Sequence, residues 1–469
     1  MSNLVFSVSH IRQAEKELIA KLPERALMER AAFGLASFIS QLTRASDLLP
    51  NQTEIVAIIG KGNNGQDCLV AGEYLTQKGF SFTSVLHTDN SQKAKQRVKS
   101  AHIVLDGIVG LGSASPISET ARNLFDQVNT DAVLIAVDLP SGVNPDTGEV
   151  YDENFCPKAN YTVTFGSLKM GLITGKAKSF TGHLHFVDIG LAPYLKKFSP
   201  IAVLPDEKDL KKIFPKRTST SHKYSKGVVA INAGSKNYPG AALLTLEGAL
   251  ASGIGMVTYL GDADQKLIKK FPQVIYGATN QNKVTASVLG PGQSKFAKNY
   301  LSFIENSKRL ILDATATQLL AREEVKKIIA NKKIQVLITP HEKEAKDLCQ
   351  VLKIPYSTNR VKLAKDLAKG TGAICLLKGP GAIVADPDYD FLLVDQFGDQ
   401  ALATAGSGDL LAGLIGAIAA DPKTSLSQAA ILGLAILGKA GQLAKSFAPE
   451  PALDLVAQSI PTAISELVS

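Results

Sequence analysis

The segment EIVAIIGKGNNGQDCLV (residues 54–70) joins an apolar run to a stretch of helical character through a glycine-rich turn. A buried strand that leads through such a turn into a helix is typical of the first βα unit of a doubly wound parallel sheet. Gly60, Gly62 and Gly65 have the Gly-x-Gly-x-x-Gly spacing of a dinucleotide-binding turn. The segment therefore predicts an α/β fold with a ligand at the strand-to-helix turn.

The side chains within this turn argue against an ordinary cofactor phosphate. Asn63 and Asn64 occupy positions that face the phosphate in a dinucleotide site. We expect the helix to run from Asp67 to Lys78. Asp67 would then lie in its first turn, where its negative charge would repel a phosphate. Three interpretations stay open on these residues: a nicotinamide-cofactor turn, a turn that holds another ligand, and a glycine-rich turn with no ligand.

The alternation of strands and helices divides the chain in two. It runs from residue 54 to about residue 190, after a helix over residues 10–45, and it restarts at residue 226, beyond a segment rich in proline and charge. We therefore predict two α/β domains, residues 1–205 and residues 206–469. The first is a Rossmann-like doubly wound domain, and the second ends in glycine- and alanine-rich helices.

Composition and charge indicate which partners and which cellular location to expect. The net charge is +8, but the lysines are scattered and no aromatic-flanked basic stripe follows them, so we expect no nucleic-acid partner. The four cysteines have no regular spacing, the first residues lack the pattern of a signal peptide, and the apolar run 429–438 is short for a membrane span. We expect a cytoplasmic protein without a membrane partner, and a homo-oligomer through its apolar helices.

Oxygen-bearing side chains follow the other strands of the first domain. Asp106 ends the strand in LDGIVGLG (105–112), and Asp138 ends the strand in VDLPSG (137–142), where Ser141 follows. Because the carboxyl ends of parallel strands meet at one crevice, these groups and Asn64 should lie together. Such an oxygen set suits a hard cation or sugar hydroxyls, and Asp138 could move protons there. Taken singly, each aspartate is explained as a turn former.

The second domain contains ATAGSGDLLAGLIGAIAA (403–420), in which Gly406 and Gly408 precede a long apolar helix. Backbone N–H groups at such a helix start form an anion hole for a phosphate, and Asp409 is placed as a general base. The alternative is an ordinary helix start with a favourable acid in its first turn.

Further glycine-rich loops surround this helix start. LLKGPGAIV (376–384) places Lys378 where nucleotide phosphates could bind, and AGSKNYPGAALL (233–244) and LGPGQS (289–294) are similar loops. In ITPHEKEAKDL (338–348), Thr339 and Glu342 have the spacing of a capping box, which leaves His341 free to face the crevice.

Residues 10–192 resemble the epimerase domain of the bacterial NAD(P)H-hydrate repair enzymes. The segments that carry the resemblance are RALMERAAFGLASFI (25–39), the glycine-rich turn and the two strand ends quoted above, and ANYTVTFGSLKMGL (159–172). The resemblance implies epimerisation at C6 of hydrated NADH or NADPH. It implies that Asn64, Asp106 and Ser141 hold K⁺ and that Asp138 contacts substrate and moves protons. The substrate-binding residues it implies are Asn63, Asn64, Gly65, Gln66, Asp67, Gly110, Leu111, Gly112 and Ser113.

Residues 220–465 resemble the ribokinase-like dehydratase domain of the same enzymes, in AGSGDLLAG and in the segment 223–257. The resemblance implies that ADP, or ATP in its place, drives dehydration of the S hydrate to NAD(P)H, with Mg²⁺ and with Asp409 as base. The residues it assigns to the nucleotide are Lys378, Gly379, Pro380, Gly381, Ala382 and Gly408, and those it assigns to the hydrate are Ala242, Gly292 and His341.

The chain departs from the family pattern at Gln66 and Cys68, which replace two glycines. Two other functions therefore stay open. One is a ribokinase-like kinase of a vitamin-type alcohol with a regulatory first domain. The other is a nucleotide-sensing protein without turnover, which the Gln66 and Cys68 substitutions favour.

Overall fold

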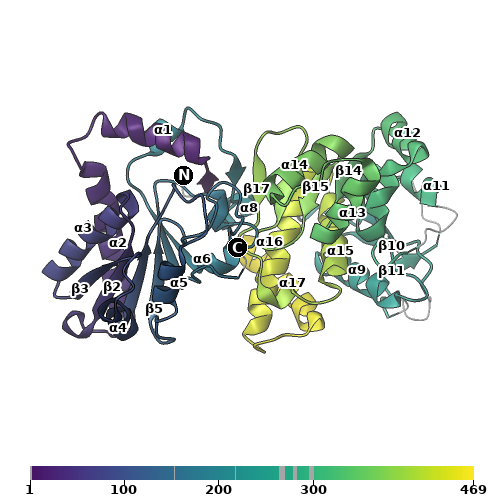
Figure 1. The fold of residues 1–469 in the computed structure, drawn as a ribbon. Coiled ribbons are helices and arrows are strands. Elements are labelled where there is room, and N and C mark those ends of the chain that lie inside the picture. The colour runs from purple at the N-terminus through teal and green to yellow at the C-terminus, as the bar shows by residue number, and fades with distance from the viewer. Residues whose placement is uncertain are drawn as a thin grey trace. The chain divides into compact units, whose positions relative to one another are not determined.

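The computed structural model describes residues 3–152, 154–216, 218–263, 270–277, 283–294 and 300–468. The chain divides into two compact units, Met1–Val203 and Leu204–Ser469. The first carries the purple to teal elements of Figure 1 and the second the teal to yellow ones. Each unit is built from parallel strands and helices, so the predicted α/β class is confirmed.

A six-stranded parallel sheet forms the centre of unit 1. The strand order is β3-β2-β4-β5-β6-β7, so the chain turns from one side of β2 to the other after β3. Ligands of such sheets bind at the carboxyl ends of the strands, next to the point where the order reverses. The strands are β2 (Glu54–Ile59), β3 (Ser81–Leu86), β4 (Ile103–Gly107), β5 (Val133–Val137), β6 (Tyr161–Phe165) and β7 (His183–Val187).

Helices cover both faces of this sheet. The two longest on one face are α2 and α3, which pack on each other, and α4 and α5 cover the other face. The predicted single helix over residues 10–45 is wrong, because residues 20–25 separate α1 from α2 and Arg25 adopts a left-handed backbone with φ 66°. The helices are α1 (Val8–Ile19), α2 (Ala26–Ala45), α3 (Asn63–Gln77), α4 (Gln92–Ser100), α5 (Glu119–Phe125), α6 (Lys178–Thr181) and α7 (Ala192–Leu195). The 3₁₀ turns are η1 (Pro50–Gln52) and η2 (Met170–Leu172). Two short strands, β1 (Leu4–Val5) and β8 (Ala202–Val203), pair antiparallel with each other.

Close packing explains two of the three glycines in the 60–65 turn. A Cβ on Gly65 would lie 2.2 Å from the carbonyl oxygen of Gly60, and one on Gly60 would lie 2.1 Å from that of Ile108. The helix α3 begins at Asn63, four residues before the predicted start at Asp67, and so its first turn rests directly on the strand end. The glycine spacing here serves helix-to-strand contact.

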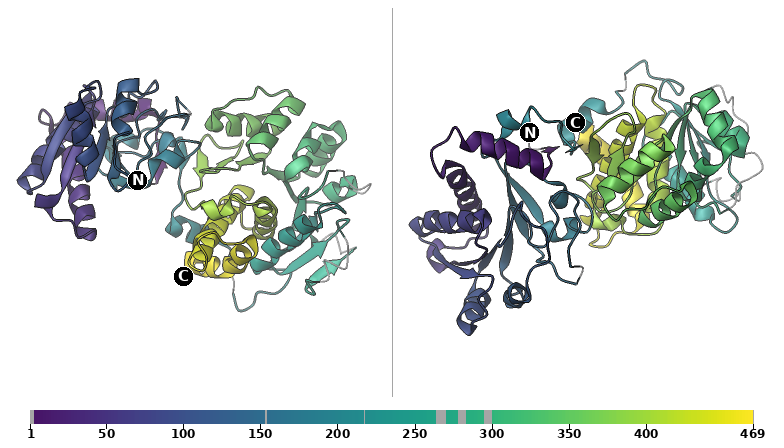
Figure 2. Two further views of the ribbon diagram at one scale, coloured as in Figure 1. Left: turned by 60° about the horizontal axis from the view of Figure 1, so that its bottom comes forward. Right: turned by 45° about the horizontal axis from the view of Figure 1, so that its top comes forward.

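The sheet of unit 2 is mixed. Strands β9 to β15 are parallel, and β16 and β17 add an antiparallel edge in the order β17-β16-β15-β14-β13-β12-β9-β10-β11. Figure 2 shows this unit in teal, green and yellow, with its helices around the strands. Here the order reverses at β9, between β10 and β12. The strands are β9 (Val228–Asn232), β10 (Met256–Tyr259), β11 (Val274–Tyr276), β12 (Ala286–Leu289), β13 (Arg309–Leu312), β14 (Gln335–Ile338), β15 (Ile374–Leu377), β16 (Ile383–Ala385) and β17 (Leu392–Val394).

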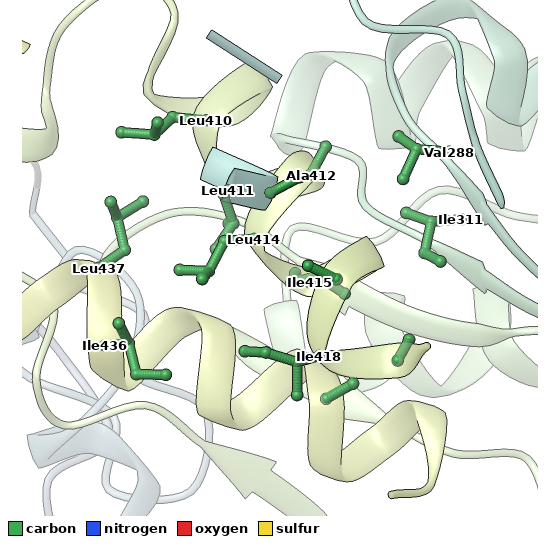
Figure 3. Close-up of a cluster of buried hydrophobic side chains, with 14 of the residues drawn as sticks. Val288, Ile311, Leu410, Leu411, Ala412, Leu414, Ile415, Ile418, Ile436 and Leu437 are labelled. Atoms are coloured by element: carbon green, nitrogen blue, oxygen red, sulfur yellow. The ribbon is translucent and has the colours of Figure 1, made fainter. Parts of the chain in front are cut away.

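Helix α15 (Ser407–Ala419) lies at the centre of the core of unit 2. It packs against α9 (Pro239–Ala251) and α16 (Leu426–Lys445), and Figure 3 shows its leucines and isoleucines facing Val288, Ile311 and the side chains of α16. A Cβ on Gly413 would lie 1.9 Å from the carbonyl oxygen of Thr245, so glycine lets α15 and α9 approach closely. The remaining helices are α8 (Glu207–Ile213), α11 (Tyr300–Glu305), α12 (Glu323–Lys332), α13 (Glu342–Leu352), α14 (Arg360–Thr371) and α17 (Leu453–Val468), with 3₁₀ turns η4 (Ala314–Ala321) and η5 (Gln400–Leu402).

By length and composition, α16 is the one helix among the described residues that could cross a membrane. Inside unit 2, however, 78% of its most apolar window is buried against the other core helices and the sheet. The apolar run 429–438 is thus part of a helix of the core.

Candidate active sites

A cavity of about 590 Å³ lies in unit 1 at the carboxyl ends of β2, β4 and β5. Helices α1 and α2 form its other walls. Of the residues predicted from sequence to bind substrate or move protons, the cavity is lined by Asn63, Asn64, Asp67, Gly110, Leu111, Gly112 and Asp138.

Asp138 faces this cavity from the end of β5 in a left-handed backbone conformation, with φ 67°. The ammonium of Lys169 forms an ion pair with its Oδ1 atom, to which Thr164 Oγ1 and the Phe165 backbone N–H also donate, at 3.2 and 3.3 Å. A non-glycine residue in this backbone region is strained and is kept there by its surroundings. Asp138 is therefore held in one orientation.

Two further carboxyl groups in the cavity have raised pKa values. Burial, and then the negative charges of Asp138 and Glu15, raise the pKa of Asp67 to about 8. Burial and the charge of Asp138 also raise the pKa of Glu15. The cavity thus combines an ion-paired carboxylate with an acid that retains its proton near neutral pH, which suits proton transfer in both directions.

The predicted cation ligands lie beside the cavity. The Ser141 hydroxyl and backbone N–H donate to the two oxygens of Asp106 at 2.6 and 2.8 Å, and both residues are fully buried. Burial raises the pKa of Asp106 to about 6, against the effect of these hydrogen bonds. The amide nitrogen of Asn64 donates to the carbonyl of Val137 at 3.0 Å, which turns its oxygen toward Gly110.

Three predicted substrate residues do not line the cavity. Gly65 is buried against Gly60, the Gln66 side chain is exposed on α3, and Ser113 is buried behind the loop after β4. Cys68 lies in α3 with its sulfur against Gly107. Gln66 and Cys68 therefore belong to a regular helix, and neither narrows the cavity.

Four charged residues that line the cavity were not predicted from the sequence: Arg12 and Glu15 of α1, Arg25 just before α2, and Lys169. Arg12 donates to the carbonyl of Leu111 at 3.1 Å and so ties α1 to the loop after β4. Glu15 and Lys169 have no neighbouring pattern that would have distinguished them from surface charges.

In unit 2, α15 begins at the carboxyl edge of the sheet. Gly406 is its N-cap with φ 90°, and Asp409 lies in its first turn. Burial, and then the charge of Asp313, raise the pKa of Asp409 to about 7, while Lys378 opposes the shift. A carboxyl group with this pKa at the positive end of a helix has the properties of a general base.

Lys378 lies among three carboxylates at this edge. Its ammonium is 2.8 Å from Asp313 Oδ1 and 3.7 Å from Glu344 Oε2, and their charges together with that of Asp409 raise its pKa despite burial. A Cβ on Gly408 would stand 3.3 Å from the same nitrogen, so Lys378 lies against the first turn of α15. The ends of β13 and β15 thus bring a cation and a base together.

The predicted capping box at 339–342 is wrong. His341 is the N-cap of α13, its Nδ1 accepts from the Glu344 backbone N–H, and the Glu344 carboxylate accepts from the backbone N–H of His341. Thr339 instead donates to Asp313 Oδ1 at 2.6 Å. The expectation that His341 is surplus to the cap is therefore corrected; its side chain is 51% exposed at the mouth of this edge.

The other residues predicted to bind the nucleotide or the hydrate lie in loops of unit 2 or in its core. Gly379, with φ 127°, lies over the buried guanidinium of Arg360, which donates to the Lys378 carbonyl at 3.1 Å. Gly292 (φ 66°) and Gly381 (φ 57°) occupy tight loops. Pro380 lies in the same turn as Gly381, and the side chains of Ala242 and Ala382 are buried in the core.

The fold and the two sites define a two-domain α/β enzyme with separate active sites. A family model described as NAD(P)H-hydrate dehydratase matches residues 229–461, and one described as YjeF-related protein N-terminus matches residues 24–99 and 83–171. The bifunctional NAD(P)H-hydrate repair enzyme Nnr of Mycobacterium leprae is 33% identical over 442 residues, which cover 88% of this chain and 89% of that protein. Nnr of Escherichia coli is 30% identical over 477 residues, 94% of this chain and 89% of that protein.

The chain belongs to the family of bifunctional NAD(P)H-hydrate repair enzymes, which confirms the resemblance seen in the sequence. Among solved structures, the ADP/ATP-dependent NAD(P)H-hydrate dehydratase from Bacillus subtilis aligns with 24% identity and a TM-score of 0.47, over 56% of this chain and 98% of that one.

Proposed function

We propose that this chain repairs hydrated NADH and NADPH by two activities, one in each unit. Unit 1 interconverts the R and S hydrates, and unit 2 dehydrates the S hydrate at the expense of ADP, releasing AMP and phosphate. The observation that carries the proposal is the pair of separate sites, each with a buried carboxyl group beside a lysine at the carboxyl edge of its sheet. Family membership supports both activities.

In unit 2, Asp409 would take the proton of the C6 hydroxyl as that oxygen attacks the terminal phosphorus of ADP. The bond to AMP breaks, and the N–H groups at the start of α15 would stabilise the charge on the transferred phosphoryl group. The ring nitrogen then expels phosphate from C6, and loss of a proton from C5 restores the double bond. Lys378 lies where it would neutralise the transferred group.

In unit 1, the substrate carbon bears both a hydroxyl and the ring nitrogen. Asp138 would accept the hydroxyl proton while the bond from C6 to nitrogen opens, and an acid would protonate the released group. Reclosure on the opposite face gives the other epimer. Asp67, whose raised pKa keeps it protonated near neutral pH, is suited to act as that acid.

The proposed function involves two cations, K⁺ and Mg²⁺. Asp106 and Ser141 form a buried hydrogen-bonded pair, and the Asn64 oxygen lies near Gly110 on the cavity wall. Oxygen ligands of this kind suit K⁺, which would fix the loops after β4 and β5. In the part of the chain that the structure describes, no three His, Cys, Asp or Glu side chains gather as a metal site. Mg²⁺ would therefore be held mainly by the nucleotide phosphates.

The proposed function is tested by recovery of nicotinamide absorbance from a mixture of R and S hydrates, with ADP, with ATP and with neither nucleotide. We expect nucleotide-dependent recovery of the whole mixture, faster than spontaneous epimerisation. Recovery of the S fraction alone would reject the epimerase, and release of a stable phosphoester from an added alcohol would favour the kinase alternative. No recovery with either nucleotide would favour a nucleotide sensor.

Replacing K⁺ by Na⁺ is expected to slow epimerisation more than dehydration, because only unit 1 has the proposed oxygen site. Each activity is measured on the same sample, with pure R hydrate for the coupled reaction and pure S hydrate for dehydration. Equal slowing of both reactions would contradict a cation at Asn64, Asp106 and Ser141.

A further inference from the structure

The hydrogen bonds to the Asp138 carboxyl group are unevenly divided between its two oxygens. Lys169 Nζ, Thr164 Oγ1 and the Phe165 N–H all donate to Oδ1. The other oxygen, Oδ2, lies at Gly110 on the cavity wall, where a Cβ would stand only 3.0 Å away. One oxygen is thus anchored by three donors, and the other lies against Gly110, a residue of the cavity wall.

Lys169 is the centre of this anchor. Its side chain is 1% exposed, and its ammonium donates to Asp138 Oδ1, to Thr164 Oγ1 at 2.9 Å and to the Phe165 carbonyl at 3.0 Å. An ammonium has three N–H donors, so all of them are used. No donor is left for a substrate, although Lys169 is among the residues that line the cavity.

Strand β6 supplies the rest of the anchor. Thr164 and Phe165 are its last two residues, and β6 pairs with β5, which ends just before Asp138. Thr164 Oγ1 contacts both the lysine and the aspartate, so the three groups form a closed arrangement. Rotation of the Asp138 carboxyl group would break the hydrogen bonds that these three donors make to Oδ1, and a buried donor that loses its acceptor lowers stability.

We propose that Lys169 is a positioning residue for epimerisation: it binds Asp138 Oδ1 and so directs Oδ2 into the cavity as the oxygen that exchanges the substrate proton. The inference rests on the proposed function of unit 1. It gives Lys169 a role in orientation and none in substrate binding. Loss of Lys169 should therefore lower kcat and leave KM nearly unchanged, since misplacement of a reacting group by about 1 Å can cost about 10²-fold in rate.

The test is Lys169→Ala, with steady-state epimerisation of the R hydrate followed through an excess of a dehydratase that has no epimerase domain. We expect kcat to fall by about 10²-fold, with KM within about threefold of the wild type. Ethylammonium, which fits the space left by the lysine tail, should restore part of kcat. Saturating K⁺ is kept throughout so that the added amine does not act at the proposed cation site.

Three controls separate the outcomes. Lys78→Ala removes another lysine of unit 1, whose ammonium donates to Ser40 Oγ away from the cavity, and should leave epimerisation and its response to ethylammonium unchanged. Dehydration of pure S hydrate by the same Lys169→Ala chain reports whether unit 2 is intact. Thr164→Val, which keeps the lysine but removes one bond to each partner, should lower kcat by a smaller factor.

The proposal is overturned if Lys169→Ala retains kcat within about threefold of wild type, or if ethylammonium restores nothing while the variant unfolds in denaturant like the wild type. If Lys169→Ala does not fold, an unchanged kcat in Thr164→Val overturns it. Failure of the wild type itself to epimerise would reject the proposed function of unit 1 and is measured first, so that the two failures are distinguished.

Discussion

Asp409→Asn is expected to lower ADP-dependent dehydration of the S hydrate by about 10²–10⁴-fold, the usual contribution of a general base. The change keeps the shape of the side chain in the first turn of α15 and removes its ability to accept a proton. Nucleotide binding should change little, because the backbone N–H groups at Gly406 to Gly408 and the Lys378 loop are untouched. The measurement is absorbance recovery from pure S hydrate with saturating ADP.

The matched control is Asp454→Asn, which alters an exposed first-turn aspartate of the neighbouring helix α17. It should dehydrate at the wild-type rate. Epimerisation in unit 1 should be unchanged in both variants. Near-normal dehydration by Asp409→Asn would contradict the assignment of the base.

The pH dependence of dehydration follows from the same residue. Asp409 must be ionised to accept a proton, and its pKa of about 7 means that kcat/KM should rise through neutral pH and level off above it. Lys378 lowers this pKa. In Lys378→Met the rising limb should therefore move to higher pH, besides any loss in the maximal rate. A limb that stays in place would show that another group controls it.

The accuracy of these assignments from sequence depended on how local each pattern is. Asp409 and its glycines are consecutive, so the helix start and its chemistry could be predicted together. Thr339 shows the opposite case: its spacing to Glu342 fits a capping box, but its hydroxyl donates to Asp313, which is 26 residues away on the neighbouring strand. The N-cap of α13 is His341, which forms the capping box with Glu344.

The unit 1 cavity shows the same limit. The strand ends at Asp106 and Asp138 could be predicted, because parallel strands bring their carboxyl ends together. Glu15 and Lys169 could not, since α1 and the segment after β6 reach the cavity through the tertiary fold alone. The places of Gln66 and Cys68 also came from the structure alone: α3 begins at Asn63, so both residues are helical, with Gln66 exposed and the Cys68 sulfur against Gly107.

Asp138→Asn is expected to stop epimerisation, with a loss of about 10²–10⁴-fold, and to leave dehydration of pure S hydrate at the wild-type rate. In the mixed-hydrate assay, absorbance should rise quickly for the S fraction and then only as fast as the R form epimerises without catalysis. The asparagine keeps the volume of the side chain, so the cavity and the bonds from β6 change little.

This variant also separates a chain whose unit 1 is active from one whose unit 1 has lost turnover while unit 2 still dehydrates. A chain that had lost epimerase turnover would show the two-phase recovery already in the wild type, and Asp138→Asn would add nothing to it. If the wild type instead recovers the whole mixture and Asp138→Asn still epimerises, the base must be Glu15 or Asp67, the other carboxyl groups of the cavity. Glu15→Gln and Asp67→Asn would then be compared, and the one that abolishes the fast conversion of R to S identifies it. Because Lys169 forms its ion pair with Asp138, the Lys169→Ala and Asp138→Asn experiments test the same pair of side chains from opposite sides.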